Sequence, residues 1–187
     1  MTKSGSSTAV ASLDPPLQVV PVDCADEVRW LDDVEMQAWL RVLRLVMLLP
    51  GSLDRQLRRD AGLTHASYMI MATLSDAPEQ SMRMSELARR TDTSQSRLSH
   101  AVSVLEQRGW VARRPCAQDG RGLVAALTTE GRQILELVAP GHVAQVRHSV
   151  LDALSADETQ QLSRLLDKIV TSLETDVDPA GRAPATS

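Results

Sequence analysis

The chain is poor in aromatic side chains, and it contains no phenylalanine. Trp and Tyr together make up 2% of its residues. A core without Phe has to be filled by aliphatic residues and by the 7 Met, and most of these residue types favour helices. With 187 residues, of which 43% are hydrophobic, the chain is long enough to bury one sizeable core. The composition therefore predicts a mainly α-helical, single-domain protein.

Long apolar runs and cysteine pairs are also lacking. The first ten residues, MTKSGSSTAV, have no apolar core of a secretion signal, and no hydrophobic stretch approaches the length that crosses a bilayer. We therefore expect a cytoplasmic protein with no membrane association. The two cysteines, Cys24 and Cys116, lie far apart in the sequence, so neither a disulfide framework nor a metal cluster is predicted.

Motifs of common catalytic and metal sites are missing as well. The sequence has no phosphate-binding loop, no nucleophile elbow and no His-Glu-x-x-His motif. His142 and His148 are spaced so that a helix would place them on different faces. We expect no metal, no cofactor and no catalytic activity.

Charge is distributed unevenly along the chain. The formal net charge is -4, yet the segment from Arg83 to Arg121 has eight arginines against four acidic residues. A basic segment inside an acidic protein is what a localised phosphate-binding surface requires. The charge pattern therefore predicts that one region of the chain contacts nucleic acid.

Periodicity in the apolar residues separates a helical region from two tails. Residues 1–28 and 176–187 show no regular period and are predicted to be flexible tails. Between them the pattern predicts helices over 32–59, 64–74, 84–90, 94–108, 129–153 and 155–173. Capping residues support these boundaries: Asp32 with Glu35, Thr64, Ser94, and Ser155 with Glu158. We expect proline to kink the first helix at Pro50 and to interrupt the fifth at 140–141.

The first and last helices carry more apolar surface than a single chain would cover. The stretch 42–49 is apolar on nearly every side and is broken mainly by Arg44. The last helix carries a continuous stripe formed by Leu162, Leu165, Leu166, Ile169, Val170 and Leu173. Both patterns favour packing against a second subunit.

The predicted helix over 94–108 has one apolar face, formed by Leu98, Ala101, Val102 and Leu105. Its outer face then carries Ser96, His100, Ser103 and Gln107, flanked by Arg97 and Ser99. Such side chains can approach a base edge and donate hydrogen bonds without repelling phosphate. Amides at the start of the helix, near Ser94 and Gln95, favour a phosphate. Taken alone, this helix is also compatible with an ordinary solvated face.

A β-hairpin is predicted directly after this helix. Residues 110–115 and 123–127 have strand patterns, and Asp119-Gly120 and Gly122 between them suit a hairpin tip. The tip would project Asp119 and Arg121, and Arg113 precedes it in the first strand. Arg121 would be able to reach a narrow minor groove, although Asp119 and Arg121 are equally able to brace the turn. The predicted DNA-binding residues are Ser94, Gln95, Ser96, Arg97, Ser99, His100, Ser103, Arg113, Asp119 and Arg121.

Between about Trp30 and Leu173 the sequence resembles the multiple antibiotic resistance regulator (MarR) family. The segments that carry the resemblance are 82–88, 94–100, 105–111, 119–122, 127–128 and Gly131. The resemblance implies a winged helix-turn-helix fold: mainly α with a small β-hairpin wing, and N- and C-terminal dimerisation helices. It implies one domain over 29–175, with a DNA-binding lobe at about 64–128 and dimerisation helices at about 31–61 and 129–175. By position, Arg121 would be the arginine that enters the minor groove, braced by Asp119.

The residues and the resemblance together predict a bacterial transcriptional regulator that binds double-stranded DNA at a specific sequence. We expect it to act as a repressor that a small-molecule effector releases from DNA. Two recognition helices related by a two-fold axis would lie about one turn of DNA apart, which predicts a homodimer on a pseudo-palindromic operator. The resemblance implies a small aromatic or phenolic effector between the dimerisation helices and the DNA-binding lobe. Trp39, His65, Tyr68 and Met71 would line that cleft, or are ordinary core residues.

Two alternatives to this function stay open. A winged helix that binds a protein partner would expose an apolar patch where this sequence has Ser, Arg, His and Gln. A thiol-based redox regulator would depend on Cys24 or Cys116.

Overall fold

The computed structural model describes residues 28–116 and 122–177. Two compact units divide the chain, Met1–Trp39 and Leu40–Ser187, and their boundary falls inside the first helix, α1 (Asp33–Ala61). In the first unit α1 begins at the predicted capping box. Asp32 Oδ1 accepts the amides of Val34 and Glu35 at 2.8 Å, and Glu35 Oε2 accepts the amide of Asp32 at 3.0 Å.

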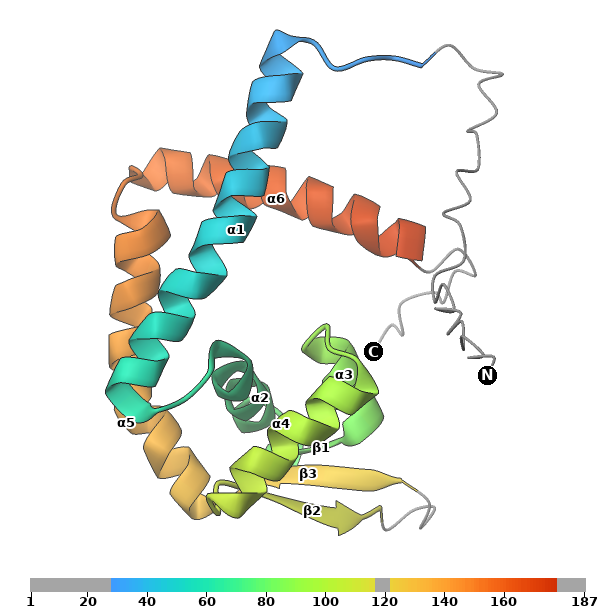
Figure 1. Ribbon diagram of the computed structural model, residues 1–187, viewed down its shortest axis with the longest axis vertical. Helices are drawn as coiled ribbons and strands as arrows, with labels where there is room; N and C mark the ends of the chain where they lie inside the picture. The colour runs from blue at the N-terminus through green and yellow to red at the C-terminus, as the bar shows by residue number, and fades with distance from the viewer. Residues whose placement is uncertain (1–27, 117–121, 178–187) are drawn as a thin grey trace, which may run out of the picture. The chain divides into compact units, whose positions relative to one another are not determined.

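The second unit contains the remainder of α1 and every later element (Figure 1). These are α2 (His65–Ser75), the 3-10 turn η1 (Pro78–Gln80), β1 (Ser81–Arg83), α3 (Met84–Arg90), α4 (Gln95–Gln107), β2 (Val111–Pro115), β3 (Leu123–Leu127), α5 (Thr129–Val146), the π-helical turn η2 (Arg147–Leu151) and α6 (Ala156–Val177). This mainly α-helical fold with a small antiparallel sheet confirms the predicted winged helix-turn-helix class.

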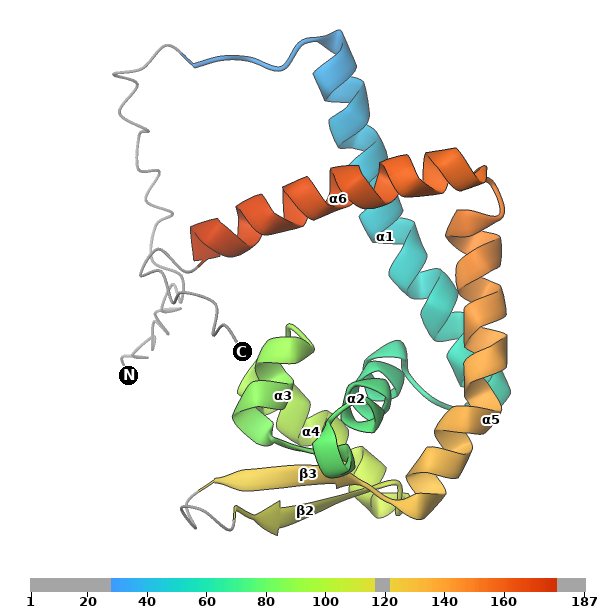
Figure 2. The ribbon, with the colours of Figure 1, turned by 180° about the vertical axis from the view of Figure 1, so that it is seen from behind.

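The sheet consists of three antiparallel strands in the order β1-β3-β2. The hairpin β2–β3 matches the prediction, with Val111 opposite Leu127 and Pro115 opposite Leu123. The strand β1 was not predicted, because three residues are too few to show a strand period and its partner is distant in the sequence, with Ser81 opposite Ala126, 45 residues away. Seen from either side, α2, α3 and α4 lie over one face of the sheet (Figure 2).

Aliphatic and methionine side chains fill the core between these helices and the sheet, as the composition predicts. Its largest fully buried members are Leu57, Leu63, Ile70, Met71, Leu74, Leu87, Leu98, Val102 and Leu105. Three of them come from α4, so this helix is held to the core by one complete face. Removing any of these side chains would cost about 2 to 5 kcal/mol, because the cavity left behind collapses only in part.

Each of the two longest proline-containing helices is continuous. The helix α1 continues through Pro50, and α5 continues through Pro140 and Gly141, so the predicted interruption of α5 was wrong. A Cβ on Gly141 would lie 3.1 Å from Asp60 Oδ2 and 3.3 Å from Gln56 Nε2. The glycine therefore allows α5 to lie close to the Gln56 and Asp60 side chains of α1, next to Pro140.

The ends of the later helices agree closely with the predicted caps. Thr64 Oγ1 accepts the amide of Ser67 at 3.0 Å, and Thr128 Oγ1 accepts the amide of Gly131 at 3.0 Å. The α6 capping box forms between Ser155 and Glu158. The helix α6 extends to Val177, two residues into the predicted C-terminal tail. The rest of that tail, and residues 1–27 of the other, lie outside the described residues.

Candidate nucleic-acid interface

The helix α4 is oriented as its sequence predicts. Leu98, Val102 and Leu105 are fully buried against the core, whereas Ser96, Arg97, His100 and Gln107 are exposed. Within the described residues, no hydrogen bond or ion pair occupies the Arg97 guanidinium or the His100 imidazole. The outer face of α4 therefore presents a cation, an imidazole, a hydroxyl and an amide to the surroundings, with no apolar side chain and no carboxylate among these four.

The start of α4 differs from the prediction in one respect. Ser94 occupies the N-cap position, but its side chain makes no capping hydrogen bond and lies 3.3 Å from Ser96 Oγ instead. Neither Ser94 nor Gln95 is buried. The amides of the first turn are thus left without the Ser94 hydroxyl as acceptor, and a helix start of this kind suits a phosphate oxygen.

Arg113 is held inside the protein by α4. From β2 it donates to Glu106 Oε2 through Nε at 2.8 Å and to Ser103 Oγ through Nη2 at 3.0 Å. Its own backbone amide donates to Glu106 Oε1 at 2.9 Å. The Arg113 guanidinium holds the pKa of Glu106 below its ordinary value. These contacts tie β2 to the C-terminal half of α4, where Ser103 is half-buried.

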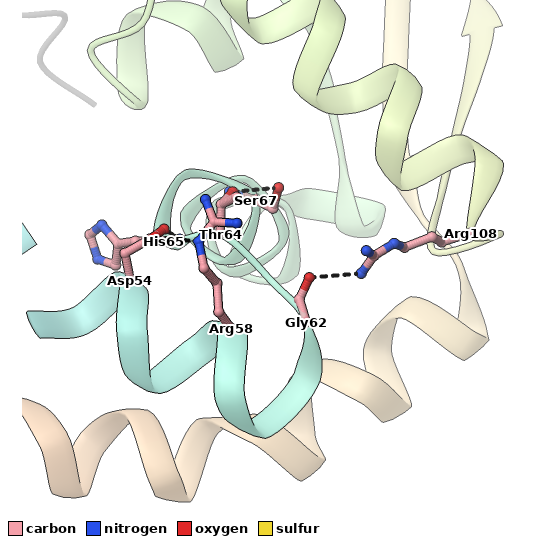
Figure 3. A network of polar contacts seen from close by, with 7 residues as sticks. All are labelled: Asp54, Arg58, Gly62, Thr64, His65, Ser67 and Arg108. Carbon is pink, nitrogen blue, oxygen red and sulfur yellow. Dashed lines mark hydrogen bonds and ion pairs between the residues drawn. The ribbon is translucent and has the colours of Figure 1, made fainter. Parts of the chain in front are cut away.

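Other arginines near α4 also have partners within the chain. Arg89 and Arg90 both donate to Glu86, and these hydrogen bonds lower the pKa of that carboxyl to about 2. Arg108 donates to the Gly62 carbonyl at 3.2 Å (Figure 3), and its guanidinium lies 5.0 Å from the Trp110 ring centroid. Arg108 therefore links the end of α4 to the end of α1. The sequence suggested that eight arginines form one basic surface. Several of them instead make contacts within the protein.

Two predicted wing residues, Asp119 and Arg121, lie outside the described residues. The strands that lead to them are in place: the Cys116 amide donates to the Gly122 carbonyl at 2.8 Å. Cys116 itself is buried.

The predicted effector residues differ in their surroundings. Met71 has no exposed surface and belongs to the core, and Trp39 is exposed in the first unit. Tyr68 packs against His142 of α5, with their ring centroids 4.2 Å apart, and the His65 ring lies 5.7 Å from the same histidine. Burial lowers the pKa of both histidines and raises that of Tyr68. His142 was not predicted as a neighbour of these residues, because it lies on a different helix.

A hydrogen-bonded network joins α1 to the start of α2 beneath this aromatic group. Asp54 accepts the His65 amide at 3.0 Å and the Arg58 side chain (Figure 3), and these bonds lower the Asp54 pKa. Nearby, Gln56 donates to Asp60 at 2.7 Å. Gln56 Oε1 and His142 Nδ1 are buried without a hydrogen-bond partner among the described residues. Polar groups thus occupy the junction of α1, α2 and α5.

Exposed aliphatic side chains are concentrated on two helices. On α1 they include Leu40, Val42, Leu43, Leu45, Val46, Met47 and Leu48, and on α6 Leu165, Leu166, Ile169, Val170 and Leu173. Both sets contain residues that the sequence predicted to face a second subunit. Across the described ranges, no helix is long and apolar enough to cross a membrane, and no cluster of three or more His, Cys, Asp or Glu side chains is arranged to hold a metal ion.

Comparison with known proteins agrees with this geometry. A family model described as MarR family matches residues 61–122. Sco3205, a MarR family transcriptional regulator from Streptomyces coelicolor solved in complex with DNA, is 42% identical with a TM-score of 0.76, over 79% of this chain and 92% of that one. AbsC, another MarR family regulator of that organism, is 39% identical with a TM-score of 0.74, over 79% of this chain and 99% of that one.

A curated relative gives a shorter match. The transcriptional repressor MprA of Escherichia coli (strain K12) is 31% identical over 114 residues, which are 60% of this chain and 64% of MprA. The match therefore spans somewhat less than two thirds of that relative. From the family model, the two Streptomyces structures and the fold, it follows that the chain belongs to the MarR family.

Proposed function

We propose that the protein is a transcriptional repressor that binds a specific double-stranded DNA operator, with α4 in the major groove. The observation that carries this proposal is the exposed polar face of α4 set on a fully buried aliphatic face. Arg97 and His100 are the strongest candidates for base or phosphate contacts, because they are exposed and have no partner among the described residues. The complex of Sco3205 with DNA and the repressor function of MprA support the proposal.

The proposal includes a homodimer. The exposed aliphatic residues of α1 and α6 would be costly in water, and a second copy of the chain would cover them. A two-fold axis would then place two copies of α4 about one turn of DNA apart on a pseudo-palindromic operator. Arg121, which lies outside the described residues, would enter the adjacent minor groove with Asp119 as its brace.

A small aromatic or phenolic effector is the proposed release signal. Among the four predicted lining residues, Tyr68 and His65 are the better candidates, because they neighbour His142 and the polar junction of α1, α2 and α5. A ligand there would act both on α2, in the proposed DNA-binding lobe, and on α5, in the proposed dimerisation region. We place this activity in the cytoplasm, where a bacterial regulator meets its DNA.

The alternative functions have less support. A protein-binding winged helix would expose an apolar patch on α4, and that face carries polar side chains instead. A redox regulator would need an accessible, activated thiol, and Cys116 is buried. Cys24 lies outside the described residues.

Titration of the protein with a fluorescent duplex from its own upstream region tests the proposal, with unrelated duplex as competitor. We expect specific binding that weakens steeply with salt, and an Arg97→Ala or His100→Ala variant that loses about 1 to 3 kcal/mol of binding free energy. Arg147→Ala serves as the matched control, since Arg147 is an exposed arginine on η2. Equal binding by the control and both α4 variants would contradict the proposed role of α4.

A further inference from the structure

We propose that Arg113 is a positioning residue, which sets the Ser103 hydroxyl as a hydrogen-bond donor toward one base edge of the operator. This inference rests on the proposed DNA-binding function. It assigns Arg113 a role different from the direct DNA contact that the sequence suggested. Arg113 would contribute to specificity through Ser103, without touching DNA itself.

The geometry around Arg113 makes this role distinct from a phosphate contact. Glu106 accepts both the Arg113 side chain, at 2.8 Å, and its backbone amide, at 2.9 Å. The Arg113 side chain is 24% exposed, against 74% for Arg89. A guanidinium that already has a carboxylate partner brings little net charge to a phosphate, and reaching one would break these hydrogen bonds.

The donor role of the Ser103 hydroxyl follows from the direction of its hydrogen bond with Arg113. Arg113 Nη2 can only donate, so the 3.0 Å contact uses a lone pair of Ser103 Oγ and leaves the O–H proton free. None of the described residues accepts a hydrogen bond from that proton. Ser103 lies on the same face as His100 and Gln107, so its hydroxyl is available to an acceptor beyond that face.

A major groove offers suitable acceptors at known positions. Guanine presents N7 and O6 there, adenine presents N7, and thymine presents O4. A hydroxyl free to rotate serves as donor or acceptor, whereas the contact with Arg113 occupies one of the two lone pairs of Ser103 Oγ and turns its O–H away from the guanidinium, which favours donation. The inference therefore predicts a preference for an acceptor at one base position in each half-site, and the preference depends on Arg113.

Two conservative variants separate positioning from phosphate contact. Arg113→Lys keeps the positive charge but loses the planar fork, and Glu106→Gln removes the carboxylate charge and leaves one acceptor oxygen where the Arg113 side chain and amide use two. If Arg113 positions Ser103, we expect both variants to bind the operator about tenfold more weakly, with binding to unrelated duplex unchanged. The slope of log K against log salt should also stay at the wild-type value, because no phosphate contact is lost.

A phosphate-contacting arginine gives a different pattern. Arg113→Lys would then bind nearly as wild type, and Glu106→Gln would bind equally well or more tightly because the guanidinium is released. Arg113→Ala would lower the salt slope by about one on operator and unrelated duplex alike. Either result would overturn the inference.

Ser103 provides an independent check that does not alter the ion pair. Ser103→Ala should lose the same base preference as Arg113→Lys in a panel of operators substituted one base pair at a time, and the double variant should bind no more weakly than either single one. Retained base preference in Ser103→Ala refutes the inference even if an Arg113 variant unfolds. Arg147→Lys, at the exposed Arg147–Asp152 ion pair, is the matched control and should bind as wild type.

The outcomes also distinguish this inference from the proposed function. Absence of specific binding by the wild-type protein would contradict the regulator proposal itself. Specific binding by the wild type together with unchanged operator affinity and base preference in Arg113→Lys, Glu106→Gln and Ser103→Ala would contradict only the role of Arg113.

Discussion

Replacing Gly131 by alanine should destabilise the protein strongly, because α5 starts in direct contact with the segment that follows α4. A Cβ on Gly131 would lie 2.0 Å from the Trp110 carbonyl oxygen and 3.0 Å from Leu127 Cδ1. The same carbonyl accepts the Thr128 amide at 3.0 Å. The added methyl group therefore has to push the first turn of α5 away from Trp110, and this hydrogen bond is lost or bent.

The size of the effect follows from two costs. Overpacking at a tight contact costs about 1 to 3 kcal/mol, and a weakened hydrogen bond to a backbone group costs about 1 to 3 kcal/mol more. The higher helix propensity of alanine returns at most about 1 kcal/mol. We therefore expect Gly131→Ala to lower the free energy of unfolding by about 1 to 5 kcal/mol, toward the upper end because the added Cβ would lie 2.0 Å from the Trp110 oxygen.

Urea unfolding at fixed protein concentration measures this change, with far-ultraviolet circular dichroism reporting helix content. Gly62→Ala is the matched control, because Gly62 has φ +63° and the nearest atom to its added Cβ is 4.0 Å away. In the control, the free energy of unfolding should fall only by the strain of a left-handed alanine backbone, about 1 to 2 kcal/mol. The reasoning is refuted if Gly131→Ala costs no more than Gly62→Ala.

Two further predictions concern pH and assembly. Burial lowers the pKa of His65 and His142, so the folded state takes up fewer protons than the unfolded one, and stability falls as pH drops below the ordinary value of 6.5. His142→Gln should make urea midpoints measured at about pH 8 and about pH 5.5 more alike than in the wild type, and an unchanged difference would contradict this. Leu166→Glu should convert the proposed dimer to a monomer or unfold the protein, since a buried charge is costly, and sedimentation analysis measures this change. An intact, folded dimer would show that the α6 stripe does not lie in the dimer interface.

Local sequence patterns were sufficient for most of the helices. The orientation of α4 follows from the i, i+3, i+4 and i+7 spacing of its aliphatic residues, and the core confirms it with Leu98, Val102 and Leu105 at zero exposure. The capping boxes at Asp32 and Ser155 predicted two helix starts closely, because a cap depends on residues three positions apart. Information of this kind is contained within one or two turns of chain.

Features that depend on distant partners were missed or misinterpreted. The strand β1 depends on its pairing with β3, and in the unbroken α5 Gly141 lies close to Asp60 and Gln56 of a helix far away in the sequence. The charge pattern identified Arg113 as basic but did not show that it faces Glu106. One signal was present: Glu106 and Arg113 flank the helix stop at Gly109, so a chain that folds back there brings them together. The stacking of Tyr68 on His142 had no comparable signal.

Methylation interference on the operator tests the central claim most directly, because a methyl group on guanine N7 blocks only the major groove. The account predicts interference at two symmetric clusters of guanines about one helical turn apart, with one interfering position in each cluster lost in His100→Ala or Arg97→Ala. Interference that is absent from the major groove, or that is identical in the wild type and both variants, would contradict the placement of α4 on DNA.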